Sequence, residues 1–125
     1  MSSYLYQAAY TPESWAHQVK NQQDPVDRVR PLVEACGGTL QSLFYCFGDY
    51  DLAIIFEAPD DESAAAVALA ASAGGSLRTA QTTKLLTVEE GMTAMRRAED
   101  AGRVYTPPVP GIPRQSGAPT STPTT

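Results

Sequence analysis

His17 is the side chain in this sequence best suited to acid–base chemistry, because it is the only histidine and histidine titrates near neutral pH. A catalytic role would require His17 to face a cleft that also holds Tyr10, Asp49 or Tyr50. The alternative is a surface histidine, without chemistry, in a short helix beside Trp15. The second interpretation is favoured, so we list His17 as a candidate ligand contact and assign no catalytic residue.

Two carboxylates and a phenol follow one another at residues 48–51, which read Gly-Asp-Tyr-Asp. Asp49, Tyr50 and Asp51 could converge on a ligand beside the edge of a sheet. The same residues suit a hairpin turn, in which Gly48 supplies a positive φ and an aspartate binds the backbone. The turn is favoured, and the three side chains remain candidate contacts.

Arg78, Thr82 and Lys84 occupy alternate positions in one extended run, so they would share a face of a strand. That face could bind an acidic ligand. Charged residues on an edge strand also discourage pairing with other strands. The edge interpretation is favoured because no Gly-rich phosphate loop accompanies these residues.

The remaining candidate contacts are Tyr10 and Trp15, which belong to an aromatic-rich N-terminal region that could line an apolar pocket. No metal site or cofactor is expected. Cys36 and Cys46 lack Cys-x-x-Cys spacing and lie in apolar stretches, which favours two reduced, buried thiols.

Charge and hydropathy exclude two classes of partner. The net charge is −5, and all fourteen acidic residues precede Arg103. An acidic domain without a stripe of basic residues is not expected to bind nucleic acid, because clustered Lys and Arg supply most of the affinity for phosphates. The longest strongly apolar stretch, residues 52–56, is far too short to span a membrane, and no signal-peptide pattern follows Met1, so we expect a cytoplasmic protein.

The pattern of elements indicates a ferredoxin-like α+β fold. Strands are predicted at 4–10, 39–47, 51–57 and 76–86, with helix starts at Thr11, Asp24, Pro59 and Thr87. The order β-α-β-β-α-β, with an extra C-terminal helix, predicts a four-stranded antiparallel sheet. We expect one domain at 1–102 and a disordered Pro/Thr-rich tail at 103–125.

The two central strand predictions are apolar on both faces, at residues 43–47 and 52–56. Helices can cover one face of the sheet, so a second copy of the chain is expected on the other. This pattern predicts a homodimer or higher homo-oligomer that associates through the sheet face, as in dimeric α+β barrels.

The segment Gly48-Asp49-Tyr50 resembles the signature of the GYD-domain family of small bacterial proteins. The resemblance extends over about residues 4 to 98, with support from Tyr10-Thr11 and from residues 33–38, 57–60 and 82–91. It implies a ferredoxin-like, dimeric α+β domain. The family provides no reaction, cofactor or catalytic residue to transfer.

Two hypotheses for function follow. The first is a non-catalytic homo-oligomeric module that binds a small ligand or a protein partner, which the lack of a nucleophile–base pair favours. The second is a small cofactor-free enzyme, a monooxygenase or isomerase of the dimeric α+β barrel kind. Fold analogy does not decide between them.

Overall fold

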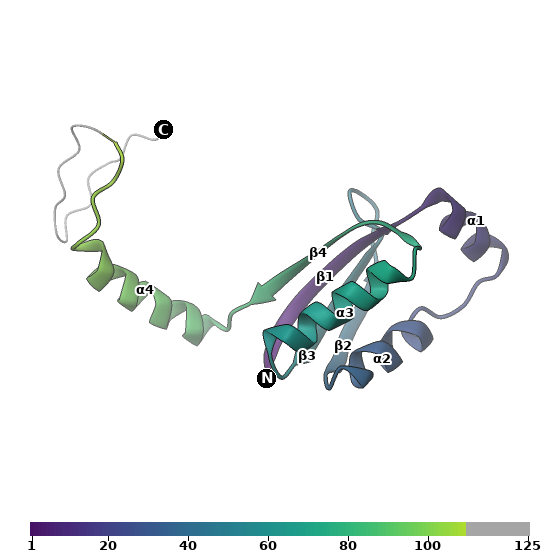
Figure 1. Cartoon of the computed structure of the whole chain (residues 1–125), viewed down its shortest axis with the longest axis horizontal. Helices are drawn as coiled ribbons and strands as arrows, with labels where there is room; N and C mark the ends of the chain where they lie inside the picture. Colours follow the sequence, from purple (N-terminus) through teal and green to yellow (C-terminus); the bar gives the residue numbers. More distant parts are fainter. Residues whose placement is uncertain (110–125) are drawn as a thin grey trace. The chain divides into compact units, whose positions relative to one another are not determined.

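The computed structural model describes residues 1–109 and divides the chain into two units, with the second beginning at Leu86. The elements of the first unit are β1 (Ser2–Tyr10), α1 (Pro12–Lys20), α2 (Val26–Ala35), β2 (Thr39–Tyr45), β3 (Leu52–Ala58), α3 (Asp61–Ala73) and β4 (Leu77–Leu85). The second unit contains α4 (Val88–Gly102) (Figure 1). The predicted α+β class, with a C-terminal helix added, is confirmed.

The four strands form one antiparallel sheet in the order β2-β3-β1-β4. Helices α2 and α3 lie against the sheet (Figure 1). The element order and the antiparallel pairing are consistent with a ferredoxin-like fold. Two short helices, α1 and α2, connect β1 to β2.

The core lies between the sheet and helices α2 and α3. Tyr4 pairs in register with Phe56, and Tyr6 with Ile54, so alternate residues of β1 and β3 point toward the helices. The alternate residues of β1 that form this face are all buried: Tyr4, Tyr6, Ala8 and Tyr10. Val33 of α2 and Val67 of α3 complete this cluster.

Side-chain caps begin three of the helices where the sequence predicted them. Thr11 Oγ1 accepts a hydrogen bond from Ser14 N at 3.0 Å, and Pro12 occupies the first turn of α1. Asp60 caps α3 in the same way. At α4, Thr87 and Glu90 form the reciprocal capping box.

The connection between β2 and β3 is longer than predicted. Strand β2 ends at Tyr45 rather than Phe47, and β3 begins at Leu52. Residues 46–51 form the loop, which Cys46 N closes by donating a 2.9 Å hydrogen bond to Asp51 O. Gly48 has the predicted positive φ, at 154°.

The sheet face opposite α2 and α3 is mixed rather than uniformly apolar. Register places Leu5, Ile55 and Phe44 on this face, together with Gln7 and Gln81. Strand β2 lies at the edge of the sheet, and the Phe44 side chain is 59% exposed there. Whether a second copy covers this face stays a prediction.

No helix within residues 1–109 is long and apolar enough to cross a membrane. Helix α4 ends at Gly102, and the division into a domain at 1–102 and a tail at 103–125 stays a prediction. Most of the predicted tail, residues 110–125, lies outside the described residues.

Candidate functional site

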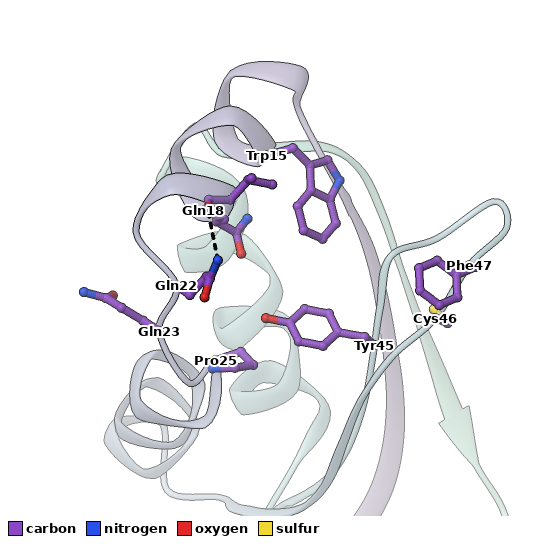
Figure 2. Close-up of a pocket in the computed structure, with 9 residues that line it drawn as sticks. Trp15, Gln18, Gln22, Gln23, Pro25, Tyr45, Cys46 and Phe47 are labelled. Atoms are coloured by element: carbon purple, nitrogen blue, oxygen red, sulfur yellow. Dashed lines mark hydrogen bonds between the residues drawn. The ribbon is translucent and has the colours of Figure 1, made fainter.

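A cleft of about 460 Å³ opens beside the end of β2, under helix α1 (Figure 2). Its walls come from α1, from the connection between α1 and α2, and from the end of β2 with the loop that follows. The lining residues are mostly apolar or carboxamide side chains: Trp15, Gln18, Val19, Gln22, Gln23, Pro25, Tyr45, Cys46 and Phe47.

Asp51 fixes the orientation of Trp15, which forms one wall of the cleft. Trp15 Nε1 donates to Asp51 Oδ2 at 3.0 Å, and Tyr10 N donates to the same oxygen at 2.9 Å. The Tyr10 and Trp15 rings also meet edge to face, with centroids 5.3 Å apart. One carboxylate therefore ties the start of α1 to the end of β1.

Tyr45 forms the opposite wall of the cleft. Figure 2 shows its ring projecting from β2 toward the connection between the two helices, with the hydroxyl on the side of Pro25. Its centroid lies 6.4 Å from that of Trp15, and the side chain is 48% exposed. Two aromatic faces are thus available to a ligand.

The polar part of the lining consists of glutamine side chains. Gln22 Nε2 donates to Val19 O at 3.0 Å, and Gln18 Nε2 donates to Ser14 Oγ at 3.1 Å. Gln18 Oε1 already accepts a hydrogen bond from Arg28 Nη2 at 3.5 Å, and each amide oxygen has two lone pairs with which to accept hydrogen bonds. No Asp, Glu, Lys, Arg or His side chain lines this cleft, so its lining carries no formal charge and is suited to hold a neutral molecule.

The structure brings three of the eight predicted contacts together: Tyr10, Trp15 and Asp51. Tyr50 points elsewhere, because its hydroxyl donates to Gln81 Oε1 at 2.9 Å. Asp49 is exposed in the loop and does not line the cleft.

His17 lies on the exposed side of α1, outside the cleft, with its Nδ1 3.4 Å from Asn21 Nδ2. Arg78 and Lys84 are also separate from the cleft and from one another. A register shift in the pairing of β1 with β4 interrupts the strand alternation beside Arg78. The shared strand face predicted for Arg78 with Thr82 and Lys84 is therefore broken at Arg78.

Lys84 belongs to a second cluster, at the start of α3. Its Nζ lies 3.1 Å from Asp61 Oδ1, which also accepts a hydrogen bond from the Tyr4 hydroxyl. The bond to Asp61 and burial together raise the pKa of Tyr4 to about 12. The Tyr4 hydroxyl and then Lys84 hold the pKa of Asp61 below its ordinary value. Lys84 is thus neutralised by a carboxylate of the same chain.

Sequence reasoning did not select most of the cleft lining. Tyr45 was read as part of a buried strand, whereas β2 is an edge strand. Trp15 and Gln18 lie one turn apart on α1, and this spacing was an available signal, whereas Gln22 follows the end of the helix. Among residues 1–109 no group of three or more His, Cys, Asp or Glu side chains could hold a metal ion.

Comparison with known proteins identifies the family. The model of the GYD domain matches residues 4–95, which include the whole of the cleft and the loop at 46–51. The comparison with curated proteins found no match. Because the family model covers most of the sequence, the chain belongs to the GYD domain family.

Proposed function

We propose that this protein is a non-catalytic module that binds a small, flat, neutral ligand in this cleft, against the rings of Trp15 and Tyr45. The observation that carries this proposal is the pair of aromatic walls, one of them held in place by Asp51. Glutamine amides at the rim would satisfy the polar edge of such a ligand.

The enzyme alternative receives less support from the same geometry. It requires His17 in a cleft with Tyr10, Asp49 or Tyr50. His17 and Asp49 are exposed outside the cleft, and Tyr50 is bonded to Gln81. These positions favour binding over proton transfer.

We further propose that the module works as a homo-oligomer. Leu5, Ile55 and Phe44 share the sheet face that α2 and α3 leave uncovered. An apolar group of this kind on a sheet is a common site of association between copies.

Trp15 makes the binding proposal directly measurable, since it is the only tryptophan in the sequence. The probe is N-phenyl-1-naphthylamine, a neutral aromatic amine with a flat naphthalene ring that accepts excitation energy from tryptophan. We expect saturable quenching of Trp15 emission as the probe enters the cleft. Loss of one aromatic wall, in Tyr45→Ala, should weaken binding about tenfold, because an aromatic contact contributes about 1 kcal/mol beyond its buried area.

Phe44→Ala is the matched control, because Phe44 is adjacent in sequence, comparably exposed and on the opposite face of β2. Its affinity for the probe should equal that of the unmodified protein. Equal weakening by both variants, or no quenching at all, would rule out the cleft as the binding site.

A further inference from the structure

A second cavity, of about 180 Å³, lies inside the first unit between the sheet and helices α2 and α3. Residues from both helices and from three strands line it, and most are apolar, including Val29, Leu32, Val67 and Leu77. The cavity shares no lining residue with the Trp15–Tyr45 cleft. A molecule in this cavity would therefore be distinct from a ligand in the cleft.

Tyr6 contributes an unusual polar atom to this interior. The residue is only 3% exposed, and its Oη is buried without a hydrogen-bond partner among residues 1–109. Buried hydroxyl groups in native proteins nearly always form hydrogen bonds, so a hydroxyl without one indicates a partner from outside the chain. The Ser72 hydroxyl acts to lower the pKa of Tyr6 but does not reach hydrogen-bonding geometry with Oη.

Burial raises the pKa of Tyr6, so the phenol stays protonated at neutral pH and acts as a donor. A protonated phenol can donate as well as accept, and an acceptor from outside the chain would satisfy its O–H group. An anion at an apolar position so deep in the protein would be strongly disfavoured. A neutral oxygen, such as a carbonyl, meets both requirements.

The other polar groups lie where the cavity approaches solvent. Arg28 is exposed, and its Nη2 donates to the Tyr10 hydroxyl at 3.3 Å. Tyr10 thus has a hydrogen-bond partner, whereas Tyr6 Oη has only Ser72 near it, outside hydrogen-bonding geometry. Arg28 and Ser76, the other polar residues of the lining, are exposed, so Tyr6 Oη is the buried polar atom without a partner among residues 1–109.

The volume limits the occupant to a single ring. An apolar cavity of about 150 Å³ accommodates benzene, and 180 Å³ leaves space for a ring with a short substituent. We propose that this cavity is a binding site for a ring-sized neutral ketone, whose carbonyl oxygen accepts a hydrogen bond from Tyr6 Oη and whose ring packs on Val29, Leu32 and Val67.

Two ligands of the same shape test the proposal: acetophenone, and α-methylstyrene, in which a CH2 group replaces the carbonyl oxygen. Binding is followed by the NMR shifts of the Val29, Leu32 and Val67 methyl groups. The unmodified protein should bind the ketone about tenfold more tightly than the alkene, since one buried hydrogen bond contributes roughly this factor.

Tyr6→Phe removes the donor and should abolish the preference for the ketone, and the alkene should then bind at least as tightly because the ketone carbonyl would be buried without a partner. Its melting temperature should not fall, because the lost hydroxyl has no partner in the unliganded protein. Ala71→Leu fills the cavity, which Ala71 lines, and should abolish binding of both compounds. Tyr45→Ala, which alters only the outer cleft, should leave both affinities unchanged.

Several results would overturn the proposal. One is the absence of methyl shifts at millimolar ketone, which would leave water as the partner of Tyr6. Another is a preference for the ketone that survives Tyr6→Phe. A third is a marked loss of stability in Tyr6→Phe, which would mean that the hydroxyl already has a partner such as Ser72.

Discussion

Two aspartates two positions apart in the same loop have different surroundings. Asp51 Oδ2 accepts hydrogen bonds from Tyr10 N and Trp15 Nε1, and its own N donates to Ala8 O at 2.8 Å. Asp49 is exposed to solvent. The carboxylates looked equivalent as candidate ligand contacts, and only the folded chain separates an organising residue from a surface one.

Asp51→Ala should therefore lower the free energy of unfolding by about 2 kcal/mol, because two N–H donors lose their acceptor. Chemical denaturation measures this change. Trp15 emission should shift to longer wavelength as the indole loses its fixed position. Asp49→Ala is the control and should change stability by less than about 0.5 kcal/mol. Equal effects of the two substitutions would remove the special role of Asp51.

Tyr4 and Asp61 give the protein a dependence on alkaline pH. The pKa of Tyr4 is raised to about 12, whereas an unfolded tyrosine titrates near 10. The folded state thus binds more protons between these values. The stabilisation is fully present below pH 10 and is lost as the pH rises toward 12.

Asp61→Asn should move the pKa of Tyr4 down toward its ordinary value, because the strongest cause of the shift is the bond to the carboxylate. Tyrosinate absorbance near 295 nm measures the titration, and subtraction of Tyr4→Phe isolates this residue. Glu62→Gln removes a neighbouring carboxylate that does not contribute to the shift and should leave the titration unchanged. A Tyr4 titration that is the same in Asp61→Asn would contradict the assignment.

At the scale of elements, local signals in the sequence predicted the helix starts better than they predicted the strand ends. Thr11, Asp60 and Thr87 are capping residues whose partners lie three positions away, so a short window contains the whole interaction. The end of β2 depends on its pairing with β3 and on Asp51, which lies across the loop. Apolar residues 46 and 47 extended the pattern beyond the hydrogen-bonded ladder.

The cleft shows the same division at longer range. Tyr10, Trp15 and Asp51 were each selected by residue type, but their convergence requires bonds between positions 36 and 41 residues apart. The exposed position of Tyr45 follows from the strand order, with β2 at the edge. A local periodicity predicts neither the convergence of these three residues nor the exposure of Tyr45. Individual cleft residues could therefore be selected from the sequence, but their arrangement could not.

Gly38 illustrates a contact between elements that only a glycine permits. A Cβ at this position would lie 2.3 Å from Glu57 O, a backbone atom of β3. Gly38→Ala should therefore lower the free energy of unfolding by about 2 kcal/mol or more, because the start of β2 must move away from its neighbour.

Thermal or chemical denaturation tests this prediction, with Gly74→Ala as the control. Gly74 ends α3 with an ordinary negative φ, and a Cβ there would meet nothing closer than 3.4 Å. That substitution should be close to neutral. If both variants have the stability of the unmodified protein, Gly38 does not lie so close to Glu57 O that a Cβ is excluded.

At the scale of the whole molecule, the uncovered sheet face is where copies of the chain are expected to meet. The face carries Leu5, Ile55 and Phe44 together with Gln7 and Gln81. A stable dimer buries about 800 Å² on each partner, with apolar residues at the centre and polar ones toward the rim. The central position of Leu5 and Ile55, on β1 and β3, matches this distribution.

Phe44→Asp should weaken self-association by at least tenfold, because it would bury a carboxylate in the contact between two copies of the chain, where the same carboxylate of the other copy would repel it. Sedimentation velocity over a range of protein concentrations measures the change. Tyr45→Asp places the same charge on the adjacent residue, whose side chain faces the cleft, and should leave the oligomer intact. If the unmodified protein sediments as a monomer at micromolar concentration, the sheet face has no such role. Dissociation by Tyr45→Asp alone would instead locate the contact between copies at the cleft, and the cleft could not then serve as a free ligand site in the oligomer.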